Sequence, residues 1–60
     1  MIVLRIRPEF EETFTELSVN GAHEEAVVNI LAAEFLRQDA EVEVLDDQGE
    51  WTDIRDVEHG

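Results

Sequence analysis

Few side chains in this chain are able to do covalent chemistry. Ser18 is the only serine and His23 follows it closely, while cysteine, lysine and tyrosine are absent. A serine nucleophile needs a base within hydrogen-bond reach and a third group that orients that base. The sequence offers no third group to Ser18 and His23, so we interpret them as residues around the start of a helix. We therefore predict a protein that is not an enzyme and has no catalytic residues.

Carboxylates are the other candidate chemistry, and they are concentrated in the segment Asp46-Asp47-Gln48-Gly49-Glu50. Hard cations such as Ca²⁺ prefer several oxygen ligands at short range. A calcium-binding loop, however, has acidic residues at alternate positions and glycine at the sixth, and Gly49 comes too early for that register. The turn preferences of Asp and Gly favour a hairpin turn instead. We predict no metal site and no cofactor, because the three glycines are also too isolated to form a phosphate-binding loop.

The charge balance is the strongest functional signal in the sequence. Sixteen acidic residues against four arginines give a net charge of −12 at pH 7. This excess excludes a nucleic-acid binder held by phosphate contacts, and it disfavours contact with anionic lipid headgroups. Mutual repulsion of so many carboxylates lowers stability at low salt. Either a basic partner or a concentrated salt solution would offset that repulsion.

Our first hypothesis is a non-enzymatic protein-binding module whose acidic surface engages a basic site on another protein. In composition alone, the chain resembles small acidic proteins of phages and mobile elements that block nucleic-acid-binding enzymes. That resemblance implies an inhibitor that mimics nucleic acid, with a nucleic-acid-binding protein as the partner. The residues expected to bind the partner are Glu41, Glu43, Asp46, Asp47, Glu50 and Asp53. The alternative is a small salt-adapted structural or interaction protein, dimeric, with no role as a decoy.

These residues need a scaffold, and its first element is a strand. Apolar residues alternate over 2–7, and Pro8 then removes a backbone donor and ends the pattern. The segment 9–19 is compatible with either a strand or a short helix. Its β-favouring residues, which alternate up to the Asn20-Gly21 break, favour the strand.

A helix follows over about 20–36. Asn20 is a suitable N-cap, and Glu24 and Glu25 are placed in the first turn, where the helix dipole favours negative charge. The apolar periodicity predicts that about half of the helix surface lies on a sheet, through Val27, Val28, Leu31, Ala32, Phe35 and Leu36. Ala26, Ile30 and Ala33 interrupt the polar far side of this helix.

A β-hairpin is predicted for 41–54, with its turn near Gly49, where a positive φ is usual. The order ββαββ packs most simply as one helix on one face of a mainly antiparallel sheet of three to four strands. The fold class is therefore α+β, and residues 1–60 form a single acidic domain. The segment 55–60 lacks periodicity and is expected to fray.

One helix leaves the second face of the sheet uncovered, and that face is expected to carry Val3 and Phe14, with Trp51 or Leu45 as further candidates. A homodimer would bury such apolar surface. The candidate interface residues are Phe14, Ile30, Ala33 and Trp51.

The absence of cysteine favours a cytoplasmic protein. Arg5 and Arg7 interrupt the N-terminal apolar stretch before it could form a signal peptide or a membrane span.

Overall fold

The N-terminal strand, β1 (Ile2–Arg7), forms the centre of the fold. The computed structural model describes residues 1–57 of the chain. Leu4 and Ile6 are buried, whereas the alternating residues Arg5 and Arg7 point to the other face of the sheet and are half-buried. The strand predicted from the alternation of residues 2–7 is therefore confirmed.

The second strand, β2 (Thr15–Val19), is shorter than the segment considered from the sequence. Residues 8–14 form a loop in which the backbone N–H of Glu11 donates to the carbonyl of Pro8. The preference for a strand over a helix is confirmed for 15–19. Phe10 lies in the loop with a φ of 71° and with 93% of its surface exposed.

The helix, α1 (Glu24–Arg37), begins later than the sequence suggested. The prediction that Asn20 is its N-cap is wrong: His23 holds that position and makes no side-chain capping bond. Asn20 comes directly after β2, and Gly21, with a φ of 133°, belongs to the turn that leads to α1. Val28 and Ala32, both on the face predicted to lie on the sheet, are the buried residues of α1.

A β-hairpin follows, as predicted, with β3 (Glu41–Leu45) and β4 (Trp51–Asp53) joined through residues 46–50. Gly49 has the expected positive φ, of 78°. The chain then makes a short 3₁₀ helix, η1 (Ile54–Asp56), whose Ile54 is buried. The expectation that 55–60 frays is wrong for Arg55 and Asp56, which belong to η1, whereas residues 58–60 lie outside the described residues.

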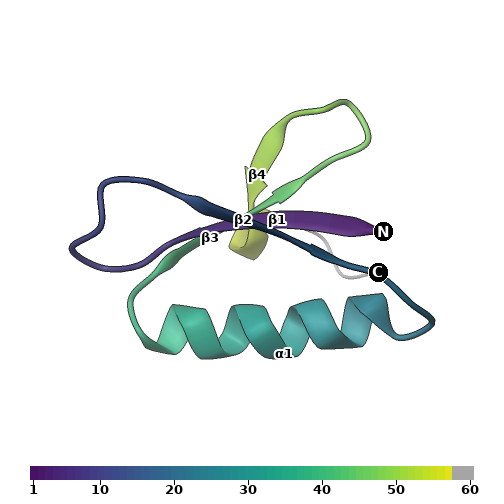
Figure 1. Ribbon diagram of the computed structural model, residues 1–60, viewed down its shortest axis with the longest axis horizontal. Coiled ribbons are helices and arrows are strands. Elements are labelled where there is room, and N and C mark those ends of the chain that lie inside the picture. The colour runs from purple at the N-terminus through teal and green to yellow at the C-terminus, as the bar shows by residue number, and fades with distance from the viewer. Residues whose placement is uncertain (58–60) are drawn as a thin grey trace.

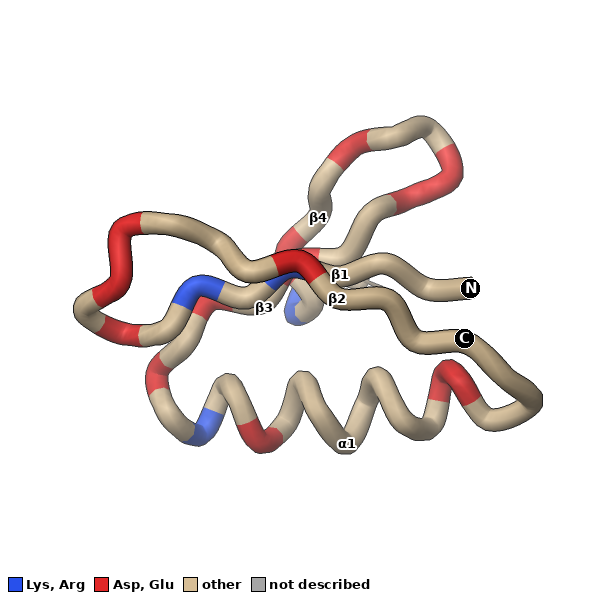
Figure 2. Tube along the Cα trace, viewed as in Figure 1, with Lys and Arg blue, Asp and Glu red and all other residues tan. Residues whose placement is uncertain are grey.

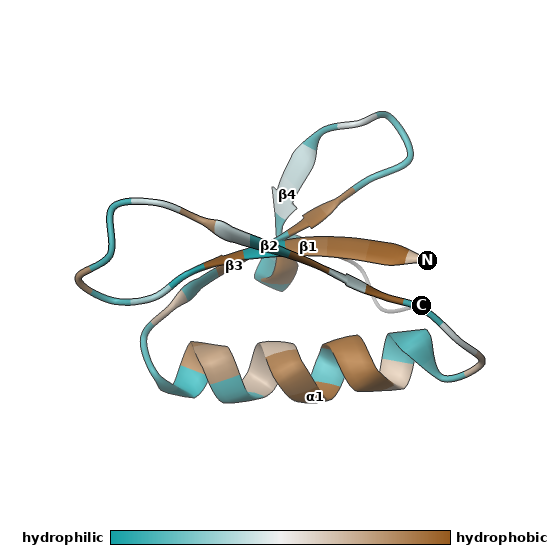
Figure 3. Cartoon of the chain, in the orientation of Figure 1, coloured by the Kyte–Doolittle hydropathy of each residue, from teal (hydrophilic) through white to brown (hydrophobic). Residues whose placement is uncertain are grey.

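The four strands form one antiparallel sheet in the order β2-β1-β3-β4. Figure 1 shows α1 along one face of this sheet, while the loop between β3 and β4 rises on the opposite side. The α+β class and the ββαββ order are thus confirmed. The hydrophobic core lies between the sheet and α1, and apolar colouring in Figure 3 marks the strands and helix that enclose it. The buried core residues are Leu4, Ile6, Val28, Ala32, Ala40, Val42 and Ile54.

The small size of this core limits the surface that the chain can hide. Of the six helix residues predicted to face the sheet, Val28 and Ala32 are buried, Leu31, Phe35 and Leu36 are half-buried, and Val27 is 41% exposed. The prediction fails for Val27 because the buried stripe is centred on Val28 and Ala32, which places Val27 on the flank of α1.

Within residues 1–57, no helix combines the length and the apolar character that a membrane crossing requires.

Candidate binding surface

The sheet face opposite α1, which we call the open face, carries the aligned polar side chains of the protein. Residues paired across antiparallel strands share a face, and the register aligns Glu16, Arg5, Glu43 and Asp53 in one row across all four strands. We call its three acidic members, Glu16, Glu43 and Asp53, the carboxylate row. Arg5 is the one basic residue among the four aligned residues, so their acidic side chains outnumber the basic one.

Arg5 holds the open face together through its flat guanidinium group. The group stacks on two aromatic rings, with its carbon 4.2 Å from the centroid of Phe14 and 4.5 Å from that of Trp51. Its Nε donates to Glu43 Oε1 at 2.6 Å, and Nη2 lies 2.5 Å from the same oxygen. Both aromatic residues are half-buried as a result. The apolar side chains predicted to lie uncovered on this face, Phe14 and Trp51, are therefore partly covered by the Arg5 side chain of the same chain.

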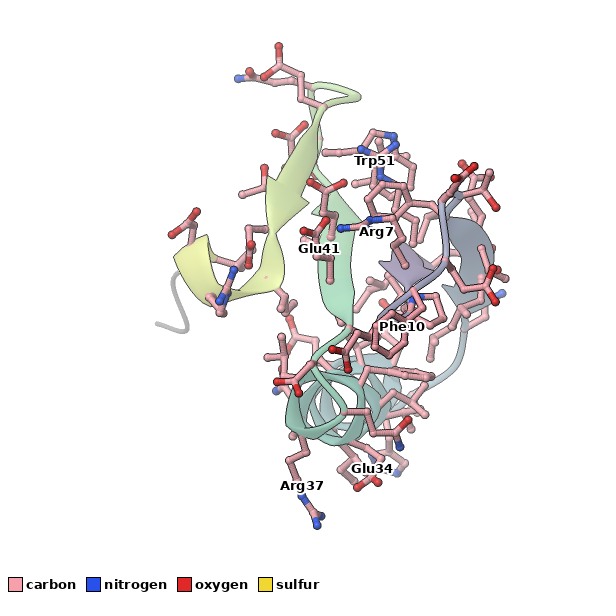
Figure 4. All side chains as sticks on the ribbon, turned by 90° about the vertical axis from the view of Figure 1, so that its left-hand side faces the viewer. Arg7, Phe10, Glu34, Arg37, Glu41 and Trp51 are labelled. Carbon is pink, nitrogen blue, oxygen red and sulfur yellow. The ribbon has the colours of Figure 1, made fainter. Side chains whose placement is uncertain are left out.

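Arg7 repeats this arrangement toward the other end of β1. Its Nη2 lies 2.7 Å from Glu41 Oε1, and its Nε donates to Glu41 Oε2 at 3.3 Å. Nη1 of Arg7 also donates to the backbone carbonyl of Glu11 at 3.0 Å, which ties the 8–14 loop to β1. In Figure 4 the Arg7 and Glu41 side chains lie beside each other. Glu41 and Glu43, both predicted to bind a partner, are thus already paired with arginines of their own chain.

Asp53 completes the row at β4 and also starts η1. Its Oδ1 accepts from the backbone N–H of Arg55 at 2.9 Å and from Nε of Arg55 at 3.0 Å, while Oδ2 accepts from Nη2 at 2.8 Å. Hydrogen bonds from the Arg55 side chain and then from its backbone N–H lower the pKa of Asp53 from 3.8 to about 2. The same contacts raise the pKa of Arg55.

The remaining predicted partner residues lie at the tip of the β3–β4 hairpin. Asp46 Oδ1 accepts from the backbone N–H groups of Gln48 and Glu50, at 2.8 Å and 2.9 Å. Asp46 is therefore a turn-forming residue, in agreement with the hairpin prediction for this segment. Asp47 and Glu50 are exposed beside it. Across residues 1–57, no group of three or more His, Asp or Glu side chains is arranged to hold a metal ion.

Every arginine of the chain has an internal acidic partner. Arg5 pairs with Glu43 and Arg7 with Glu41, and the other two pairs are Arg37–Glu34 and Arg55–Asp53. The carboxylates of residues 1–57 that have no ion-pair partner are Glu9, Glu11, Glu12, Glu16, Glu25, Asp39, Asp46, Asp47, Glu50 and Asp56. Figure 2 shows many of them in the two loops that flank the open face, 8–14 and 46–50. The uncompensated side-chain charge of this surface is therefore negative.

The four candidate dimer residues fall on two opposite surfaces. Phe14 and Trp51 belong to the open face, where both contact Arg5. Ile30 is 70% exposed and Ala33 is also exposed, both on the helix side. The structure therefore does not bring these residues together as one interface.

Ser18 and His23, the pair weighed for catalysis, are not joined by any of the side-chain hydrogen bonds among residues 1–57. Ser18 is aligned with Val3 on the open face, while His23 precedes α1 on the other side. A shallow depression at the start of α1 is lined by residues 21–26, including the acidic side chains of Glu24 and Glu25. It contains no arrangement of nucleophile, base and orienting group.

Sequence reasoning missed three features of this surface: the covering role of Arg5 and Arg7, the position of Glu16 in the row, and the exposed Phe10. The available signal was the matching alternation of arginines at 5 and 7 with glutamates at 41 and 43. Using it required knowing that β1 and β3 are neighbours, which local patterns do not reveal.

Comparisons of the chain with protein-family models, with curated proteins and with solved structures found no match.

Proposed function

We propose that this protein is a non-enzymatic binding module whose acidic surface engages a basic site on another protein. The observation that supports the proposal is the pairing of all four arginines inside the chain, which leaves unpaired carboxylates as the charged groups offered to a partner. Such a surface attracts a basic partner over a distance and favours the correct docking orientation.

The proposal extends to mimicry of nucleic acid. A protein that binds phosphates with Lys and Arg side chains presents a surface complementary to closely spaced carboxylates. The open face offers such a surface, since the carboxylate row is flanked by two acidic loops. The module would then act as an inhibitor that occupies the phosphate-binding site of a nucleic-acid-binding protein. The absence of cysteine fits a cytoplasmic location for it.

The structure changes which carboxylates should bind. Glu41 and Glu43 are already neutralised by Arg7 and Arg5, so they contribute less than the sequence suggested. Glu16 and Asp47 are exposed and have no ion-pair partner in residues 1–57, so they are better candidates.

The experiment is capture of partners from the native host at low salt, followed by calorimetry with the purified partner between about 0.05 and 0.3 M salt. We expect affinity to fall steeply with salt, and Glu16→Lys and Asp47→Lys each to weaken binding. Glu25→Lys makes the same charge change on α1 and serves as the control. A partner whose affinity is unaffected by salt and by both reversals would contradict the proposal, as would salt-sensitive binding of the protein itself to DNA or RNA.

A second candidate function is that of a salt-adapted, dimeric interaction protein without a decoy role. The exposed Ile30 and Val27, on the side of the molecule away from the carboxylate row, favour it. This candidate requires poor folding in about 0.1 M KCl and recovery in about 2 M KCl, together with a dimer that Ile30→Asp dissociates. Cooperative thermal unfolding of a monomer at the lower salt concentration would rule it out.

A further inference from the structure

We propose that the open face recognises arginine in preference to lysine on its partner, an inference that rests on the proposed function and specifies the partner's chemistry. The occupant of this unpartnered sheet face is then an arginine-rich segment of a basic protein. Two observations support the choice: the charge of the carboxylate row, and the aromatic rings of Phe14 and Trp51 that stand on the same face.

The protein's own Arg5 shows which cation this face accommodates. A guanidinium group is flat, is weakly hydrated, stacks on aromatic rings and presents several N–H donors in a fixed plane. Arg5 combines the stacking and the directed donors, since it contacts two rings and directs two nitrogens to Glu43. A lysine ammonium is a compact, strongly hydrated charge without a plane to stack. The chemistry that holds Arg5 therefore favours arginine over lysine at neighbouring positions.

Acceptors for a second guanidinium group remain beside Arg5. Both contacts from Arg5 to Glu43 go to Oε1, so Oε2 of Glu43 has no bond to Arg5. On the other side of Arg5, Glu16 is aligned with it across β1 and β2, is exposed, and has no ion-pair partner in residues 1–57. A partner arginine is thus expected to bind Glu16 or Glu43 Oε2 while its plane lies against Phe14 or Trp51.

The surroundings of the row raise the local concentration of such a partner. The 8–14 loop carries Glu9, Glu11 and Glu12 at one end of the sheet, and the hairpin tip carries further carboxylates at the other (Figure 2). In Figure 4 Trp51 stands on the same side of the sheet as Arg7 and Glu41. An extended basic segment that crosses the strands would pass between the two acidic loops and over the aromatic rings.

The test uses two synthetic peptides, hexa-arginine and hexa-lysine, with the whole protein in about 0.05 M salt. Trp51 is the only tryptophan, so its fluorescence reports binding at the open face directly, and calorimetry gives the affinity. We expect hexa-arginine to bind about fivefold more tightly, which is the factor that one exposed cation–π contact of about 1 kcal/mol produces. We also expect hexa-arginine to change Trp51 fluorescence more than hexa-lysine does.

Two variants locate the preference. Phe14→Leu keeps an apolar side chain but removes one ring, so it should reduce the arginine preference to about twofold while leaving hexa-lysine affinity unchanged. Glu16→Gln should weaken hexa-arginine binding at least threefold, whereas Glu25→Gln, which removes the same charge from α1, should not. Unfolding curves of each variant confirm that the fold is retained.

The outcomes separate the two proposals. Equal affinities for the two peptides, or a preference that stays at about fivefold in Phe14→Leu, would overturn arginine recognition while leaving an acidic binding module intact. Equal weakening by Glu16→Gln and Glu25→Gln would also overturn it, because binding would then follow net charge alone. If neither peptide binds, both the arginine preference and the proposed function fail.

Discussion

Replacing Arg5 by methionine tests the claim that this side chain holds the open face together. Methionine keeps an apolar stem of similar length and removes the guanidinium group. Each of the two ring contacts, at 4.2 Å and 4.5 Å, is worth about 0.5–1 kcal/mol at a partly exposed site. The half-buried ion pair with Glu43 adds about 1 kcal/mol. The change also removes the positive charge that lies between Glu43 and Glu16, which adds a repulsion of about 0.5 kcal/mol.

The expected loss is therefore about 2.5–3.5 kcal/mol in the free energy of unfolding. A 60-residue domain has a total stability of roughly 3–9 kcal/mol, so Arg5→Met should remove a large part of it. The melting temperature should fall by roughly 10–28 °C, given about 4–8 °C for each kcal/mol in a domain of this size. Arg5→Lys keeps the charge but not the flat stacking group, so its loss should be intermediate.

The assay is urea unfolding near pH 7 in about 0.15 M salt, followed by Trp51 fluorescence and by far-UV circular dichroism, so that a local signal and a global one can be compared. Arg37→Met is the matched control, because it removes the same charge from an exposed pair with Glu34 and should cost less than about 0.5 kcal/mol. If Arg5→Met and Arg37→Met destabilise the protein equally, net charge explains the effect and the stacking argument is refuted.

Two further predictions concern strain and acid. Phe10 is 93% exposed and has a φ of 71°, so Phe10→Gly should raise the free energy of unfolding by about 0.5–1 kcal/mol in urea titrations, while Phe10→Ala, which keeps the backbone penalty, should not. NMR titration should give Asp53 a pKa of about 2, and Arg55→Gln should return it toward 3.8; a value near 3.8 in the unmodified protein would contradict the bonds described. Because the folded-state pKa is below the unfolded one, the stability that Asp53 contributes is present above about pH 4 and is lost as the pH falls toward 2, a loss that Asp53→Asn should remove from the acid unfolding curve.

Regular patterns made the scaffold predictable. The alternation over 2–7, the helical periodicity before Arg37 and the turn at Gly49 each reflect interactions between residues close in sequence. These elements were therefore found at nearly their true positions, and one helix on one sheet was the simplest way to bury their apolar sides.

The open face was harder to predict because its contacts join residues that are distant in sequence. Arg5 contacts Glu43 only because β1 pairs with β3 as well as with β2. The propensities of the separate segments do not predict which strands will pair. The prediction of where α1 starts was wrong for a related reason. Asn20 has the side chain of an N-cap, but it comes directly after β2, and His23 takes the cap position after the turn at Gly21. The conformation of Phe10 has no sequence signal at all, since a bulky residue rarely adopts a positive φ.

The pairing of β1 with β3 also determines when this chain is able to fold. Both hairpins, β1–β2 and β3–β4, close locally, but the two central strands are separated by a hairpin strand and the whole of α1. Leu4 and Ile6 reach their buried state only when Val42 arrives from the second half. During synthesis, the first half must therefore remain without a complete core until β3 has left the ribosome. Loop closure over this distance slows folding relative to a helical bundle of the same length, and the two halves should become ordered in a single cooperative step.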